Sequence, residues 1–318
     1  MPGTPLSKAQ FDALLQRAES APPWLAIDPG QVEAHYNRSG FLVSHRLPDH
    51  PLFTLDALFP LCRRMPPGQV KFRFGVVPGD AHFDSSLVRY NGGLTLAEAI
   101  DHLEEKRAYI AVYNPERDAE YRPVIEGLLA ELGLATREHE LFFNWYSTYV
   151  FISANDSVTP YHMDREMNFL LQVRGTKTVQ LWDPLDDEVM RSAQRDHLFS
   201  NGTDARPPYH DGLPAKARRF ELKPGLGVHH PFIAPHLVTT GPNVSVSLAI
   251  TFRTPGSDIV SDAHRYNDRF RRYGLGRIPV GEHAALDATK ARVMRTLRGT
   301  RAIVGRSVPF RHGRDAST

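Results

Sequence analysis

The sequence predicts a mostly β fold with flanking helices, of the barrel or double-sheet jelly-roll kind. Several short runs rich in β-branched and aromatic residues follow one another between residues 147 and 253, and turn residues separate them. Few helical patterns interrupt these runs, whereas helical patterns dominate after residue 256. A central β core between two partly helical flanks accounts for this order.

The region before the β core alternates predicted helices with short predicted strands. Ser7 with Gln10, and Thr95 with Glu98, have the spacing of capping boxes, in which two residues cap each other's backbone N–H at a helix start. The predicted helices are 8–18, 54–65, 95–107 and 122–132, the last one stopped by Gly133. The predicted strands are 70–76 and 109–113.

Turn signals mark where the strands of the β core should end. Arg174-Gly175-Thr176 is typical of a tight turn, and Pro224-Gly225 ends a loop. The segment 186–222 is polar and rich in Pro and Gly, so we expect a long insertion, which often serves as a lid. The predicted core strands are 149–153, 168–173, 177–182 and 244–252.

Two further helices are predicted over 258–273 and 284–303. Such a pair can pack back on the barrel or form a homodimer interface, and the sequence does not decide between the two. The expected regions are an N-terminal helical and strand region that packs on the barrel over 1–105, the β core with its insertion over 106–255, and the C-terminal helices over 256–318.

Composition and charge exclude several classes of protein. A hydrophobic content of 41% excludes general disorder, and a net charge of +2 is too small to predict a polyanionic partner. Residues 256–318 hold 13 Lys and Arg against 6 Asp and Glu, an excess that is most often a solvated helical face, so nucleic acid is not the expected partner. Cys62 alone permits no internal disulfide, and no run of residues resembles a signal peptide or a membrane span. We therefore expect a soluble cytoplasmic protein.

The stretch Thr159-Pro160-Tyr161-His162-Met163-Asp164 is the most informative part of the sequence. Residues two apart on a strand point to the same face, so His162 and Asp164 would present an imidazole and a carboxylate side by side. A non-heme iron site uses two histidines and one carboxylate and leaves other positions of the metal open. A His-x-Asp pair alone is weak evidence, because it occurs by chance in many sequences.

Lys177 strengthens the prediction of a site. It lies on the strand that returns from the Gly175 turn, among apolar residues, where a lysine is unusual. If its side chain faces the core it requires a buried anionic partner, for which the distal carboxylate of 2-oxoglutarate is suitable. The alternative is an edge strand on which Lys177 faces solvent.

The third metal ligand should come from a later strand. His229, His230 and His236 are the candidates, and His236 is preferred because it stands just before the final strand, where the mouth of a barrel would place it. His229 or His230 could instead line the cavity or bind substrate.

Together these residues resemble the JmjC oxygenases, which have a double-stranded β-helix (jelly-roll) fold of the cupin type. The spacing from Thr159 to Lys177 matches the family without a gap, and the stretch from Pro224 to His236 is similar to the segment that leads to its last metal ligand. The similarity is greatest to the asparaginyl hydroxylase that inhibits hypoxia-inducible factor and to bacterial cupin-like relatives, and it covers about residues 105–253.

The resemblance implies an Fe(II)- and 2-oxoglutarate-dependent oxygenase that uses O2, hydroxylates its substrate, and releases succinate and CO2. By the same resemblance, the residues that hold the metal are His162, Asp164 and His236. Those that hold the distal carboxylate of 2-oxoglutarate are Lys177, Thr159 and Tyr109, and the residue near its proximal carboxylate is Asn168.

Two positions depart from the family pattern. Leu226-Gly227 stand where an acidic residue often follows the Pro-Gly pair, and since that residue is not a ligand, the predicted iron site is unaffected. A second amide near the proximal carboxylate is missing, because the sequence offers Ser247 or Ala249 there.

Two other kinds of protein are alternatives to the oxygenase: a metal cupin that does not use 2-oxoglutarate, and a non-catalytic cupin-like protein that binds a ligand or regulates a partner. Lys177, Thr159 and Tyr109 favour the oxygenase, because neither alternative needs them. The substrate is expected to be a protein or peptide side chain or a small-molecule metabolite. Candidates for the lining of its pocket are Tyr146, Tyr149, Trp182, His229 and the 186–222 insertion, although aromatic residues at strand positions more often belong to the core.

Overall fold

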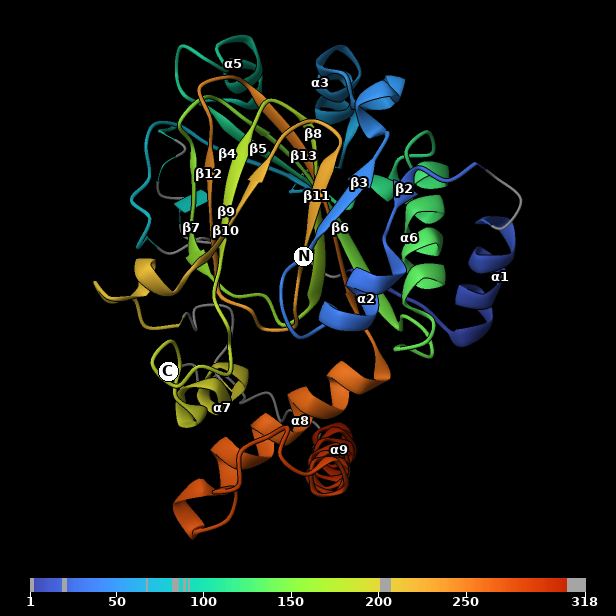
Figure 1. Cartoon of the computed structure of the whole chain (residues 1–318), viewed down its shortest axis with the longest axis vertical. Helices are drawn as coiled ribbons and strands as arrows, with labels where there is room; N and C mark the ends of the chain where they lie inside the picture. The colour runs from blue at the N-terminus through green and yellow to red at the C-terminus, as the bar shows by residue number, and fades with distance from the viewer. Residues whose placement is uncertain are drawn as a thin grey trace, which may run out of the picture.

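The computed structural model describes residues 3–18, 22–66, 68–81, 86–87, 90, 92–200 and 207–307, and their strands form two antiparallel sheets that face each other (Figure 1). The larger sheet has the order β2 (Leu25–Ala26), β3 (Leu42–His45), β11 (Leu226–His230), β8 (Met167–Arg174), β13 (Ser245–Arg253), β6 (Trp145–Ser153), β5 (Tyr109–Tyr113) and β4 (Val70–Arg73), and β1 (Thr4–Pro5) pairs with β6. The smaller sheet has the order β10 (Arg218–Leu222), β9 (Lys177–Leu181), β12 (His236–Thr240) and β7 (Val158–His162).

The chain crosses between the two sheets at nearly every strand from β6 to β13. Strands β6, β8, β11 and β13 belong to the larger sheet, and β7, β9, β10 and β12 belong to the smaller one. This alternation is the double-stranded β-helix, so the prediction of a mostly β jelly roll with flanking helices is confirmed.

The core strands bury both of their faces. On β13, Leu248 and Ile250 face the main apolar core beneath the helices, whereas Ala249 faces the second sheet. On β8, Leu171 and Leu170 divide in the same way. This explains why the core strands are near-continuous hydrophobic runs, and why polar residues on the inner face stand out as candidates for function.

The helices flank the larger sheet on one side and lie at both ends of the strands (Figure 1). They are α1 (Lys8–Ala18), α2 (Pro29–His35), α3 (Leu55–Arg64), α5 (Leu96–Asp101), α6 (Arg122–Thr136), α7 (Ser192–Ser200), α8 (Pro255–Phe270) and α9 (Ala284–Ser307). The predicted capping boxes are both present: Ser7 with Gln10 before α1, and Thr95 with Glu98 before α5.

Several predicted ends are wrong. Helix α6 continues through Gly133 to Thr136, because Gly133 serves for close packing: a Cβ atom there would lie 2.5 Å from the Phe11 ring of α1. Helix α5 ends at Asp101 rather than near 107, and β4 ends at Arg73 rather than at 76.

The 186–222 segment is only in part the expected loop. Its last residues form β10, which pairs with β9 along its whole length, and its first half contains α7. Asp196 of α7 is fully buried and accepts a 2.8 Å hydrogen bond from Nδ1 of His264 on α8. This segment is therefore anchored to the C-terminal helices, and its residues 201–206 lie outside the described residues.

The C-terminal helices pack on each other below the barrel (Figure 1). Asp262 of α8 accepts hydrogen bonds from Arg265 of the same helix and from Arg295 and Arg298 of α9. These residues line a cavity of about 440 Å³ beside the start of α8. Residues 308–318 of the basic tail lie outside the described part of the chain.

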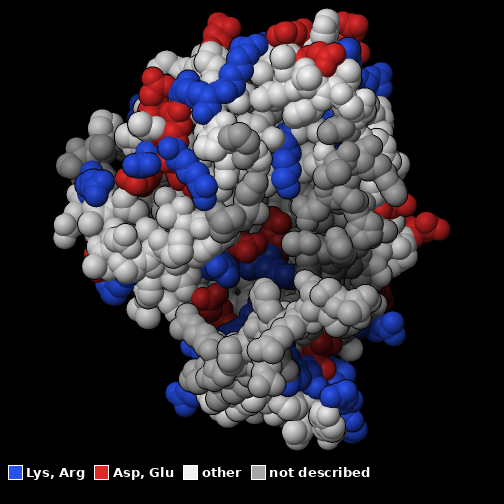
Figure 2. Space-filling view, turned by 180° about the vertical axis from the view of Figure 1, so that it is seen from behind, with Lys and Arg blue, Asp and Glu red and all other residues white. Residues whose placement is uncertain are grey.

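Charge is mixed on the face shown in Figure 2, where acidic and basic side chains lie among one another, and both kinds are visible in a hollow between the larger upper part and the smaller lower part. No helix among the described residues is long and apolar enough to cross a membrane. The division of the chain at residues 105 and 255 stays a prediction.

Candidate metal centre

Two neighbouring strands of the smaller sheet bring His162 and His236 together. His162 ends β7 and His236 begins β12, and the two residues are direct partners in the antiparallel pairing of these strands. Their rings lie 4.1 Å apart between centroids. Asp164 follows two residues after His162, in the loop that leaves β7.

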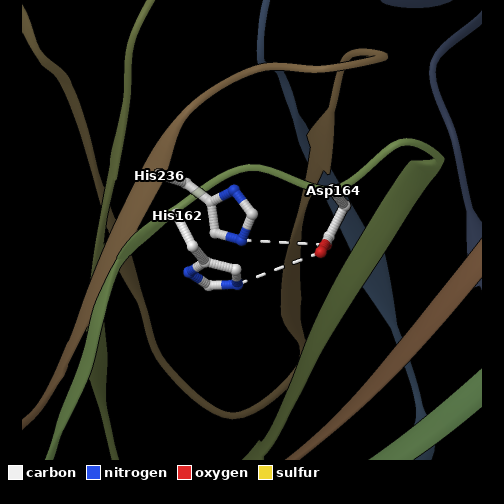
Figure 3. A group of neighbouring side chains, drawn as sticks. All are labelled: His162, Asp164 and His236. Atoms are coloured by element: carbon white, nitrogen blue, oxygen red, sulfur yellow. Dashed lines mark ion pairs between the residues drawn. The ribbon is translucent and has the colours of Figure 1, made fainter. Parts of the chain in front are cut away.

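Asp164 turns its carboxylate toward both rings (Figure 3). Its Oδ1 lies 4.0 Å from Nε2 of His162, and its Oδ2 lies 3.8 Å from Nε2 of His236. One ligand atom from each of the three residues lies within 4.8 Å of the others, so a single ion can reach all three. Two imidazoles and one carboxylate on one side of a metal form the facial triad of non-heme iron sites.

The backbone fixes which nitrogen each histidine offers. Nδ1 of His162 lies 2.7 Å from the carbonyl oxygen of Pro160, and Nδ1 of His236 lies 3.0 Å from that of Ala234. A carbonyl only accepts, so each Nδ1 carries the proton and donates it, which leaves the lone pair on Nε2. Both lone pairs are thereby available to a metal, as in most metal sites with histidine ligands.

Burial keeps these histidines neutral. It lowers the pKa of His162 to about 4 and that of His236 to about 4. Neutral imidazole is the form that binds a metal, so neither ring has to lose a proton at neutral pH before it can bind. The donor set therefore fits Fe(II) in both chemistry and protonation state.

Lys177 faces the barrel interior and not the solvent, which were the two alternatives that the sequence left open. Its side chain is only 3% exposed, and its Nζ donates a 2.6 Å hydrogen bond to Oγ of Ser247 on β13. No ion pair links it to any described acidic residue, and burial lowers the pKa of Lys177 to about 7. A buried cation without an anion is costly, so this position favours a bound anionic group.

Tyr109 and Thr159 lie on the same interior surface. The Tyr109 hydroxyl is 3.3 Å from Oγ1 of Thr159, and the Tyr109 ring packs against Phe151, over which Nζ of Lys177 lies at 5.6 Å from the centroid. The structure therefore brings together all three residues predicted to hold the distal carboxylate. Their role in binding stays a prediction.

Arg73 is a second buried cation, which the sequence analysis missed. It is fully buried, its guanidinium stacks on the Tyr109 ring at 4.4 Å, and its Nη2 donates to the Val158 carbonyl. In the described part of the chain, its Nε and Nη1 have no hydrogen-bond partner. Alternation with Phe72 and Phe74 is the usual pattern of a solvent-facing residue, so sequence alone gave no signal of this placement.

The remaining candidate residues for the site lie on two sides of the larger sheet: Asn168 and His230 face the barrel interior, and His229 faces the main core. Asn168 and His230 are register partners on β8 and β11. His229 lies in the main core, stacked on Tyr36 at 5.1 Å, with Nδ1 near the Asn168 carbonyl and Nε2 accepting from the Asn37 N–H. His229 is therefore a structural residue rather than part of the cavity.

The aromatic residues that were predicted to line the substrate pocket lie in different parts of the structure. Tyr146 belongs to the main core, and Trp182 packs in another cluster with its indole N–H on the Leu213 carbonyl. Only Tyr149 packs near the site, stacked with Phe151. Glu166, two residues beyond Asp164, is half-buried, and burial together with Asp164 raises its pKa to about 7.

Comparisons with known proteins concern solved structures, since no family model and no curated protein matches the sequence. The chain is similar to the X-ray structure of ycfD from E. coli, at 17% identity over 87% of this chain and 68% of that chain, with a TM-score of 0.46. It is also similar to YcfD, a ribosomal oxygenase from Escherichia coli, in complex with cobalt and 2-oxoglutarate, at 18% identity over 86% and 67% of the chains and a TM-score of 0.45. Such low identity transfers no activity to this chain, so its function rests on its own residues.

Proposed function

We propose that this protein is an Fe(II)- and 2-oxoglutarate-dependent oxygenase that hydroxylates a protein or peptide side chain or a small-molecule metabolite, with release of succinate and CO2. One observation supports the proposal: the His162–Asp164–His236 triad and the buried Lys177, which has no anionic partner among the described residues, face the same barrel interior. A metal cupin that does not use 2-oxoglutarate, and a non-catalytic cupin, need no such lysine.

The three ligands would hold Fe(II) through two Nε2 atoms and one carboxylate oxygen, and would leave positions open for 2-oxoglutarate and O2. Iron supplies the oxidative chemistry when bound. The work of the protein is to orient the reactants: each histidine is held by its Nδ1 bond to the backbone, and the apolar inner face restricts water.

Lys177, Thr159 and Tyr109 would bind the distal carboxylate of 2-oxoglutarate, and Asn168 would lie near the proximal one. Lys177 acts in this proposal as an anchor and not as a base, because an ammonium that is paired with a carboxylate stays protonated. Arg73 behind Tyr109 adds positive potential at the same end of the barrel.

Anaerobic addition of Fe(II) and 2-oxoglutarate to the purified protein tests the proposal. We expect a weak visible charge-transfer band from the iron chelate of the 2-oxo acid. Bound iron without the band would overturn the 2-oxoglutarate assignment and favour another metal cupin. No bound iron at all would favour a protein that is not an enzyme.

A homodimer formed through the C-terminal helices is a second proposal. Large apolar residues are exposed in this region, among them Leu275, Ile278 and Val293. We expect light scattering to give a dimer for the full-length protein and a shift toward monomer for Val293→Asp. The matched control is Val76→Asp, which changes an exposed valine on the opposite flank and should leave the mass unchanged. A wild-type monomer at all concentrations would contradict the dimer.

The cytoplasmic location also stays a proposal and rests on the sequence alone.

A further inference from the structure

Among the described residues, neither ring nitrogen of His230 has a hydrogen-bond partner, although only 3% of the residue is exposed. Its neighbour His229 is equally buried and has a partner for both nitrogens. A neutral imidazole carries one N–H donor and one acceptor, and leaving both unpaired when the residue is buried is unfavourable. His230 is therefore arranged for something that binds, rather than for the folded chain alone.

The location of His230 indicates what binds. Its ring meets the ring of His236 edge-on, at 4.7 Å between centroids and 70° between planes. It is not one of the three residues whose ligand atoms converge. His230 therefore stands beside the metal position, on the opposite sheet from the two histidine ligands.

Asn168 lies next to His230 and, like it, has a buried polar atom without a hydrogen bond among the described residues. The two residues are register partners on β11 and β8, and Oδ1 of Asn168 is also buried without a hydrogen bond from any residue that the structure describes. The two side chains do not bond each other, so one group placed between them could pair with both. If the Asn168 amide turns about its last torsion, its NH2 group takes the place of the unpaired oxygen and both residues become donors.

Two inward-facing positions on β13 are not available for this task. Ser247 already accepts the Lys177 hydrogen bond, and Ala249 is packed in the inner apolar cluster. An anion that reaches from Lys177 to the metal would have its second acidic group beside the ligand rings. Among the described side chains that are buried and unpaired, His230 is the one in ring contact with a metal ligand, and Asn168 is its register partner.

We propose that His230, together with Asn168, binds the carboxylate of 2-oxoglutarate that adjoins its oxo group, with an imidazole N–H in place of a second amide. This inference rests on the proposed function. It assigns His230 as a positioning residue for the cosubstrate and not as a metal ligand.

Calorimetric titration of the protein loaded with Mn(II), without O2, tests this assignment. Succinate provides the matched ligand, because it keeps the distal carboxylate and is one carbon shorter: its other carboxylate takes the place of the oxo group, and the carboxylate that adjoins the oxo group is missing. For His230→Val we expect the affinity for 2-oxoglutarate to fall about tenfold or more, as for the loss of a hydrogen bond to a charged group. Affinities for succinate and for Mn(II) alone should stay within about twofold of wild type.

The variants also separate the two proposals. If wild type binds Mn(II) but not 2-oxoglutarate, the proposed function fails first. If wild type binds both and His230→Val binds 2-oxoglutarate equally well, only the role of His230 is overturned. A loss of Mn(II) affinity in His230→Val as large as the loss for 2-oxoglutarate would likewise overturn it.

Thermal unfolding of the metal-free protein provides a second readout. Valine is a good strand residue and removes two unpaired polar atoms, so His230→Val should unfold at or above the wild-type temperature. Should this variant fail to fold, Asn168→Ala takes its place in the titration, with the same selective loss expected. Unchanged 2-oxoglutarate affinity in that variant would overturn the shared carboxylate site.

Discussion

Replacing His162 with alanine is expected to weaken Fe(II) binding by more than about 100-fold and to reduce turnover to background. Removing a residue that only hydrogen-bonds to a metal ligand lowers metal affinity or activity by about 10- to 100-fold, and removing the ligand itself should exceed that range. His236 and Asp164 would remain, but two ligands do not fix the geometry in which the open positions face the cosubstrate.

Metal titration by calorimetry, followed by the visible chelate band, measures this effect. Asp164→Asn should behave similarly, because the amide keeps the size of the side chain and loses its charge. The matched control is His102→Ala, since His102 is exposed on the surface and its side chain forms a hydrogen bond with the exposed Glu105 rather than with any residue of the metal centre. Wild-type metal affinity in His162→Ala would contradict the triad.

The sequence was informative where local spacing decides geometry. His162 and Asp164 are two residues apart, so a strand end places them together whatever the rest of the fold does. The capping boxes at Ser7 and Thr95 were equally predictable, because each depends on residues within one helical turn.

The sequence was less informative where distant segments decide. Nothing local distinguishes His229 from His230, and only the pairing of β11 with β8 sends one into the core and the other toward the metal. Arg73 likewise became an interior residue only through its pairing with Tyr109 on β5. The predicted helix end at Gly133 is wrong for the same kind of reason, since the close approach of Phe11 comes from a helix far away in the chain.

Lys177 is expected to make 2-oxoglutarate binding strongly dependent on pH. Burial lowers the pKa of Lys177 to about 7 in the protein without ligand, whereas an exposed lysine titrates near 10.4. The distal carboxylate requires the charged form and raises that pKa when it binds. Above pH 7 the free protein must therefore take up a proton on binding, and the apparent dissociation constant should rise by up to about tenfold per pH unit between pH 7 and 9.

The same shift predicts how the stability of the metal-free protein changes with pH. A lysine whose pKa is lower in the folded state binds fewer protons when folded than when unfolded. The contribution of Lys177 to the free energy of unfolding is therefore lowest below pH 7 and rises as the pH increases toward 10. In Lys177→Met the ammonium is absent, so its gain in unfolding free energy over wild type should be largest at pH 6 and should shrink toward pH 9.

Calorimetry in two buffers of different ionisation enthalpy measures the proton uptake. We expect close to one proton at pH 8.5 and almost none at pH 6 in wild type, with both values near zero in Lys177→Met. Lys177→Met should also weaken 2-oxoglutarate binding by about 30-fold or more at pH 6, as for the loss of one partner of a buried charge pair. Lys177→Arg is the matched control, because its guanidinium stays charged throughout this range and should remove the pH dependence while keeping a cation in the pocket. Equal affinity of wild type and Lys177→Met at pH 6 would show that the carboxylate is held elsewhere. Arg73, which has two nitrogens without a partner among the described residues and stacks on the Tyr109 ring, would then be a candidate donor.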